Sequence, residues 1–159
     1  MRIDIDLHSQ TLILLSDLGD VLRTYPVSTA LRGAGECSGS ECTPRGAHVI
    51  RAKIGSGQPI NTVFVGRRPT GEIYSPEMAE LNPERDWILT RILWLSGKEP
   101  GFNRLGECDT MRRYIYIHGT PDKIFKQIPE SHGCIRMRNA DLVELFDLVP
   151  VYTPVMIKD

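Results

Sequence analysis

The strongest constraint on the fold of this chain is a succession of short runs in which apolar or β-branched residues alternate with polar ones. Alternation with a period of two turns one face of each run toward a core, so the runs predict strands. Turn-forming residues at 18–20, 55–57 and 67–71 separate several of them. The predicted strands cover residues 2–7, 11–15, 21–28, 48–54, 62–65, 87–95, 113–118 and 153–158.

Helices are predicted only late in the chain. Asn139 is a good N-cap for a helix over residues 140–149, which Pro150 ends. Residues 121–127 predict a second, short helix with proline in its first turn. The longer helix has one apolar face, made by Leu142, Leu145, Phe146 and Val149.

The segment at residues 87–95 fits either a strand or a helix, because its apolar periodicity does not decide between them. No linker, repeat or low-complexity segment divides the chain, which predicts one domain over residues 1–159. The predicted fold is therefore mainly β with a few short helices, in a single closed β-sandwich or barrel-like domain.

Composition excludes several classes of protein. The chain has 159 residues, of which 41% are hydrophobic and 25% charged, so it can bury a sizeable core. Its net charge is −1. Without a basic field, nucleic acid is not an expected partner. No apolar run is long enough to cross a bilayer, so no membrane association is expected.

Residues 1–7 alternate apolar and charged side chains, which indicates a strand and not a signal peptide. With Met1 as the native start, we expect a cytoplasmic protein. A sequence trimmed from a longer precursor would instead be compatible with the periplasm.

A cysteine and two histidines stand in two neighbouring motifs. The first motif is YIHGT at residues 116–120, and the second is SHGCIR at residues 131–136. A strand that ends at His118, followed by a return of the chain through residues 121–130, would place its imidazole beside Cys134. Because a thiol nucleophile needs such a base, the pattern predicts the chemistry of a cysteine acyltransferase.

His118 is predicted as the base in preference to His132, since residues two apart on an extended chain are too constrained to share a proton. His118 would take the thiol proton and later return one to the leaving amine. The carbonyl of Gly119, bent back toward the ring, is the simplest group to hold the imidazole tautomer. Gly133 permits a sharp turn into Cys134, and the N–H groups of these two residues would form an oxyanion hole.

Two arginines follow the cysteine. Arg136 and Arg138 make the sequence around Cys134 electropositive, which would depress the thiol pKa and attract a carboxylate-bearing substrate. Arg136 has two interpretations that stay open. Its guanidinium either binds a substrate carboxylate through two hydrogen bonds or braces the turn after Cys134 through backbone carbonyls.

Other interpretations of the same residues also stay open. Cys134 is compatible with a buried core thiol whose neighbouring histidines only cap turns. A zinc site could use His118, His132 and Cys134, but structural zinc sites prefer four ligands in short-spaced pairs. The fourth ligand would be remote: Cys108, Cys42 or His8. No metal and no other cofactor is therefore predicted.

The remaining cysteines have no histidine nearby in the sequence. Cys37 and Cys42 flank a Gly/Ser-rich turn and could close a small disulfide loop. In a reducing compartment they would be free thiols. Cys108 also lies in a predicted loop, so none of the three competes with Cys134 as nucleophile.

The motifs HGT, residues 118–120, and SHGCIR, residues 131–136, resemble the signature of the L,D-transpeptidase catalytic domain, the YkuD-type family. Residues 25–29 and 43–46 also look like the family's early strand and its Thr-Pro-x-Gly loop. Residues 66–112 are the least covered and form a family-variable segment. The resemblance implies a cysteine enzyme that cleaves the bond between diaminopimelate and D-alanine in peptidoglycan stem peptides, with an amine or water as acceptor.

Carried over onto this sequence, the resemblance makes Cys134 the nucleophile, His118 the base and Gly119 the carbonyl that orients it. It also implies covalent inhibition by carbapenem-type lactams. The residues expected to shape the site are Gly133, His132 and Ser131, and those expected to bind substrate are Arg136, Tyr116 and Thr120.

In the cytoplasm there is no mature wall to cross-link, whereas recycled tetrapeptides or muropeptides are plausible substrates. We therefore expect water as acceptor and an L,D-carboxypeptidase that releases terminal D-Ala in murein recycling. The alternatives are an L,D-transpeptidase that forms cross-links and a catalytically silent muropeptide-binding module. Residues 66–112 would form a lid over the cleft or a solvated surface loop. The charged and polar residues of that lid are Arg85, Asp86, Lys98, Glu99, Asn103 and Arg104.

Overall fold

The computed structural model describes residues 1–159, and ten strands account for most of its regular structure. The strands are β1 (Arg2–Asp6), β2 (Thr11–Leu15), β3 (Val21–Pro26), β4 (Gly46–Ile54), β5 (Thr62–Val65), β6 (Arg68–Ile73), β7 (Ile88–Gly97), β8 (Tyr116–Gly119), β9 (Ile135–Met137) and β10 (Pro154–Lys158). The helices are α1 (Pro76–Leu81), the short 3-10 helix η1 (Gly106–Cys108) and α2 (Asn139–Leu148).

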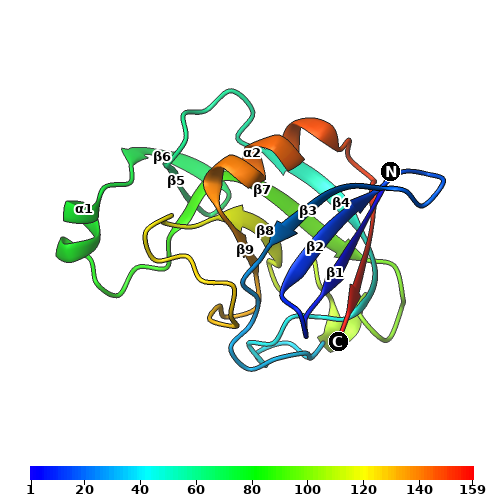
Figure 1. Cartoon of the computed structure of the whole chain (residues 1–159). Helices are drawn as coiled ribbons and strands as arrows, with labels where there is room; N and C mark the ends of the chain where they lie inside the picture. Colours follow the sequence, from blue (N-terminus) through cyan, green and yellow to red (C-terminus); the bar gives the residue numbers. More distant parts are fainter.

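All ten strands belong to one sheet, which curls into a half-barrel (Figure 1). The main path runs β3-β2-β1-β10-β4-β7-β5-β6, while β8 pairs with β7 and carries β9 on its other side. The first strand is parallel to the last, with Ile3 opposite Val155 and Ile5 opposite Ile157. The mainly β, barrel-like class predicted from the sequence is confirmed.

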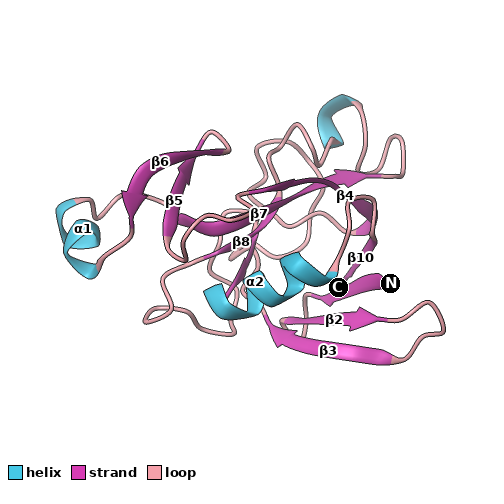
Figure 2. Ribbon diagram, turned by 90° about the horizontal axis from the view of Figure 1, so that it is seen from above, coloured by secondary structure: helices cyan, strands magenta, loops and turns pink.

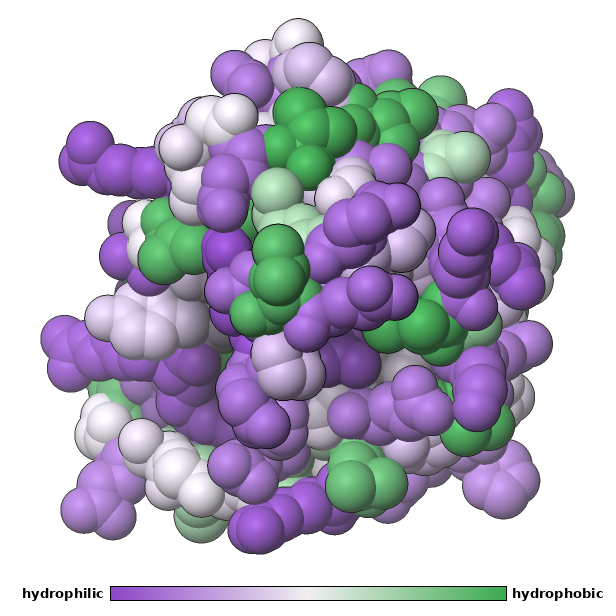
Figure 3. Space-filling model, turned by 90° about the vertical axis from the view of Figure 1, so that its left-hand side faces the viewer, coloured by the Kyte–Doolittle hydropathy of each residue, from purple (hydrophilic) through white to green (hydrophobic).

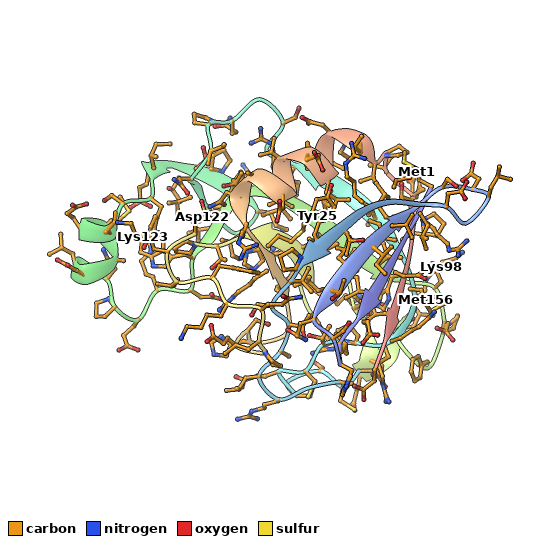
Figure 4. The ribbon with its side chains drawn as sticks, viewed as in Figure 1. Met1, Tyr25, Lys98, Asp122, Lys123 and Met156 are labelled. Carbon is orange, nitrogen blue, oxygen red and sulfur yellow. The ribbon has the colours of Figure 1, made fainter.

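Helix α2 lies across the sheet and closes the core (Figure 2). Leu142 and Leu145 are fully buried and Phe146 nearly so, as the predicted apolar face requires. Each such side chain contributes about 1.5–3 kcal/mol through burial. Tyr25 of β3 reaches the helix, where its hydroxyl donates to Glu144 Oε1 at 2.5 Å (Figure 4). None of the helices has the length and apolar character that crossing a membrane requires.

The start of α2 differs from the prediction. Arg138 is the N-cap residue, and Asn139 already belongs to the helix. The reason is tertiary: the Asn139 side chain turns inward and its Nδ2 donates to the carbonyl of Thr120 at 2.9 Å. Asp122 Oδ1 instead accepts the Asn139 N–H at 3.0 Å. Residues 121–127 form turns, so the short helix predicted there is wrong.

The undecided segment at residues 87–95 is a strand. β7 pairs with β4, β5 and β8 in the middle of the sheet, and most of its residues are buried. Burial on both faces explains why its sequence lacks a clear alternation. Four elements were not predicted. They are β6, whose exposed residues read as a turn, α1, whose N-cap Ser75 accepts from Met78 N at 3.2 Å, and the three-residue elements η1 and β9.

Candidate functional site

The register of β8 and β9 brings the two sequence motifs together. The strands are parallel, with Ile117 opposite Ile135, and both isoleucines are fully buried in the core. Because side chains alternate along a strand, their neighbours turn to the other face. Those neighbours line a cavity of about 310 Å³: Tyr116 and His118 from β8, Arg136 from β9, and Cys134 directly before β9.

Cys134 is half-buried at the wall of this cavity. Its Sγ accepts a hydrogen bond from the Tyr116 backbone N–H at 3.4 Å and donates one to the Tyr114 carbonyl at 3.4 Å. Burial raises the pKa of the Cys134 thiol to about 12, although the Tyr116 N–H and two arginine side chains lower it in part. The sulfur is therefore a neutral thiol at neutral pH and becomes nucleophilic only when a base takes its proton.

The expected depression of the thiol pKa by neighbouring arginines is wrong in its net effect. Arg136 does act in the expected direction, but the loss of hydration outweighs it. The Arg138 guanidinium lies over the Phe125 ring, 4.9 Å from the centroid. The sequence shows that charged residues lie near the cysteine. It does not show the burial of the thiol, which shifts the pKa in the opposite direction.

His118 is buried, and burial lowers the pKa of its imidazole below the usual value. Its Nδ1 lies 2.6 Å from the Gly119 carbonyl oxygen, the contact expected from the sequence. A carbonyl can only accept, so Nδ1 carries the proton and Nε2 presents a lone pair. Gly119 has no substitute here, because a Cβ would collide with Asn139 Oδ1 and the Leu89 carbonyl.

The turn before Cys134 is held by hydroxyl groups. Ser131 Oγ donates to the Cys134 carbonyl at 2.6 Å and accepts the Gly133 N–H at 3.2 Å. Thr43, from the Thr-Pro-x-Gly loop, donates to the Gly133 carbonyl at 2.9 Å. Of the two N–H groups considered for an oxyanion hole, that of Gly133 is thus already bonded, whereas no hydrogen bond occupies that of Cys134.

Known proteins resemble this chain in sequence and in fold. The sequence model of the L,D-transpeptidase catalytic domain matches residues 1–157. The chain belongs to this family. Among curated proteins, no sequence matches it significantly.

Solved structures of L,D-transpeptidases share the fold. The structure from Xylanimonas cellulosilytica DSM 15894 has a TM-score of 0.56 and 21% identity, over 98% of this chain and 59% of that one. The Mycobacterium smegmatis enzyme gives 0.56 and 21%, over 99% and 58%. L,D-transpeptidase 3 from Mycobacterium tuberculosis, in complex with a faropenem-derived adduct, gives 0.58 and 15%, over 99% and 59%. The chain thus spans less than two thirds of the length of these relatives.

The other site residues expected from the resemblance to L,D-transpeptidases divide into two groups. Ser131 and His132 line the cavity with Tyr116, and His132 is exposed at its rim. Thr120 lies outside the cavity, buried, with its carbonyl bonded to Asn139. Arg136 does line it, but its Nη2 donates to Asp86 Oδ1 at 3.0 Å, not to backbone carbonyls.

Several lining residues were not singled out as site residues by the sequence. They come from distant segments and carry no motif: Phe64, Arg67, Ile88, Ile92, Arg113 and Tyr114. Asp86 was expected only as part of a lid. The family-variable segment at residues 66–112 therefore supplies much of the cavity wall, including Asp86 and Arg67. Only the tertiary fold brings these residues to Cys134.

All four cysteines are free thiols, so Cys37 and Cys42 do not close a disulfide loop in this structure. Cys37 instead lies beside Cys108, and burial together with this neighbouring thiol raises the pKa of Cys108. No group of three or more His, Cys, Asp or Glu side chains is arranged to hold a metal ion. The ligands considered for a zinc site do not form such a group.

Proposed function

We propose that this chain is a cysteine-dependent L,D-carboxypeptidase that releases terminal D-Ala from peptidoglycan stem tetrapeptides. The observation that carries the proposal is the position of Cys134 and His118 on one wall of one cavity, with the His118 Nδ1 fixed by Gly119. Membership of the L,D-transpeptidase family supports acyl transfer through a cysteine. A relative whose structure contains a faropenem-derived adduct supports the same chemistry.

Acylation begins with a proton transfer. His118 Nε2 takes the proton of the Cys134 thiol, and the thiolate attacks the carbonyl carbon of the third stem residue. The Cys134 N–H is free to donate to the oxyanion that forms. The C–N bond to D-Ala then breaks, the His118 imidazolium gives its proton to the leaving amine, and a thioester remains on Cys134.

Deacylation requires an acceptor. Water loses a proton to His118 and attacks the thioester carbonyl, which releases the tripeptide and restores the thiol. The cavity volume of about 310 Å³ supports water, because it lies at the lower end of the range for small-molecule sites. Our proposal places this reaction in the cytoplasm, on recycled tetrapeptides, and cell fractionation tests that location.

The second candidate is an L,D-transpeptidase, favoured by the family and by the solved relatives that carry that name. It shares the acylation step and differs only in the acceptor. A catalytically silent muropeptide-binding module is the third outcome to be tested.

One experiment separates the three. Purified protein is incubated with a tetrapeptide that has diaminopimelate in third position, and the products are resolved by mass. Our proposal requires tripeptide and free D-Ala in equal amounts, also when a second stem peptide is added as acceptor. Cross-linked dimers would assign the chain to transpeptidation. Unchanged peptide with a correctly folded protein would contradict catalysis altogether.

A further inference from the structure

Three arginines line the cavity that holds Cys134, and they differ in what their guanidinium groups bind. Arg136 forms an ion pair with Asp86 at 3.0 Å. Arg113 donates to two backbone carbonyls of a neighbouring loop, the shorter bond measuring 2.7 Å. Arg67 has neither a carboxylate nor a carbonyl partner, and its one hydrogen bond runs from Nη1 to the Tyr116 hydroxyl at 3.1 Å. Arg136 also keeps an unbonded donor, its buried Nε, but its charge is paired with Asp86. Arg67 is thus the cavity arginine whose charge has no carboxylate partner and whose remaining donors are left for a ligand.

The backbone conformation at Arg67 is unfavourable for an arginine. Gly66 and Arg67 form the tip of the hairpin between β5 and β6, with φ angles of 57° and 65°. Hairpin turns with two positive φ angles prefer Asn or Gly at these positions, because a Cβ is unfavourable there. The turn itself therefore does not explain an arginine. Residues held in such conformations against preference concentrate at ligand-binding sites.

Aromatic rings hold the Arg67 side chain in place. Its guanidinium carbon lies 4.7 Å from the centroid of the Tyr114 ring and 5.0 Å from that of Trp94. Trp94 packs edge-on against Tyr116 at 5.9 Å. Stacking of this kind fixes the plane of the guanidinium before any ligand arrives. Tyr114 and Tyr116 are also the residues whose backbone contacts Cys134 Sγ, so the held charge lies close to the nucleophile.

Arg67 and Arg136 lie toward opposite ends of the site. Arg67 contacts Tyr114 and Tyr116, at the start of β8, whereas Arg136 is paired in register with His118, near its end. Cys134 precedes Arg136 by two residues and lies next to Tyr116. A donor peptide that extends along the cavity would therefore meet Arg67 near the thiol and Arg136 farther along β8, at the level of His118. Figure 3 shows the face of the molecule on the side of α1 and the β5–β6 hairpin, which is mostly hydrophilic with several separate hydrophobic patches.

We propose that Arg67 is a specificity-determining residue that binds a carboxylate on the acyl side of the donor peptide, away from the terminal D-Ala. The inference rests on the proposed acyl-enzyme function but is independent of whether water or an amine is the acceptor. The ligand class is a stem peptide whose second or third residue carries a free carboxylate. Arg136 would remain available, through exchange with Asp86, for the terminal carboxylate.

The test compares Arg67→Gly with Arg68→Ala. Arg68 is the next residue of the same hairpin, is exposed and does not line the cavity, so it is the matched control. Each protein is assayed for D-Ala release from the free tetrapeptide and from two analogues, amidated at the second residue or at the side-chain carboxylate of the third. The two analogues identify which carboxylate is bound.

In the wild type we expect one amidation to lower kcat/KM by about 10- to 100-fold, the range for a hydrogen-bonded charge. Arg67→Gly should lower kcat/KM on the free peptide by the same factor, mainly through KM. It should also abolish the preference for the free peptide over that amidated analogue. Arg68→Ala should behave as wild type. Because glycine suits a positive φ, the relieved backbone should offset the lost contacts with Trp94, Tyr114 and Tyr116, and Tm should change little. Equal losses on all three peptides, or a lowered Tm with the preference intact, would assign Arg67 to the scaffold.

A binding measurement separates this inference from the proposed function. In a Cys134→Ala background, calorimetric Kd values for the free and amidated peptides need no turnover. A preference that Arg67→Gly removes would support Arg67 as the binding residue even where the wild type releases no D-Ala. No preference in either background would refute the inference while leaving the proposed activity standing.

Discussion

The protein contains two buried histidines that are bonded in the same way at Nδ1. His48 on β4 and His118 on β8 each have Nδ1 bonded to a glycine carbonyl, at 3.0 and 2.6 Å, and burial lowers the pKa of both, that of His48 to about 4. The difference lies at Nε2. That of His48 is bonded to Thr110 Oγ1 at 2.9 Å, whereas that of His118 has no hydrogen-bond partner, in a cavity shared with Cys134. A perturbed pKa alone therefore does not single out the histidine proposed as the base. What distinguishes His118 is an unbonded Nε2 in the cavity that also holds Cys134, the proposed nucleophile.

The largest effect is expected when the Cys134 thiol, which shares the cavity with His118, is removed. Cys134→Ala should lower D-Ala release by about 10⁴-fold or more, because no other cysteine lines the cavity and the Ser131 hydroxyl there is bonded to the Cys134 carbonyl. The fold should be retained, since a half-buried thiol contributes little packing. Cys37→Ala is the control, with activity expected near wild type. Substantial turnover by the Cys134 variant would overturn the mechanism.

The next test replaces the histidines one at a time. We expect His118→Gln to slow acylation by a carbapenem-type lactam by about 10²- to 10⁴-fold, the usual contribution of a general base. His48→Gln and His132→Ala should retain much more of the rate. Stopped-flow measurement of the acylation step reports this directly. A larger loss in the His132 variant would mean that the base has been misassigned.

The buried His48 should make the free energy of unfolding depend on pH. Its pKa is about 4 in the folded protein and about 6.5 when unfolded, so the unfolded chain binds the extra proton between these values. Stability should therefore fall as the pH drops from about 6.5 to about 4, by about 3 kcal/mol from this group. Urea unfolding of wild type and His48→Gln across this range measures the difference. His118 acts in the same direction, so a His118→Gln protein serves as the second reference.

The smallest effect is expected when His48 Nε2 is left without a hydrogen-bond partner, as His118 Nε2 is. Thr110→Val removes the hydroxyl that bonds His48 Nε2 and leaves this nitrogen buried without a partner. The cost should be about 1–3 kcal/mol in the free energy of unfolding. D-Ala release should stay within about twofold of wild type, because no nucleophile lies near His48 to be activated. An activity loss larger than the stability loss explains would connect the His48 region to the site.

Much of the fold could be predicted because strands with one buried face alternate visibly, as β1 and β2 do. β6 escaped prediction since its residues are almost all exposed and include Pro69 and Gly71, which read as a turn. The N-cap was misplaced by one residue because Asn139 is bound by tertiary partners.

The site was predictable to the extent that its residues share two nearby motifs. His118 and Gly119 lie on β8, Cys134 directly precedes the adjacent β9, and a strand followed by a return of the chain is a local inference. Arg67 and Asp86 come from segments far away in sequence, so nothing local connects them to Cys134. The pKa of the thiol was misjudged for a related reason, since burial depends on the whole fold.

The most direct test of the central claim is the location of a covalent adduct. After incubation with a carbapenem-type lactam, intact-mass analysis and peptide mapping should find one adduct per chain, on the peptide that contains Cys134. The His118→Gln protein should form the same adduct much more slowly, and His48→Gln at nearly the normal rate. An adduct on Cys37, Cys42 or Cys108, or none on the folded wild type, would contradict Cys134 and His118 as the reacting pair.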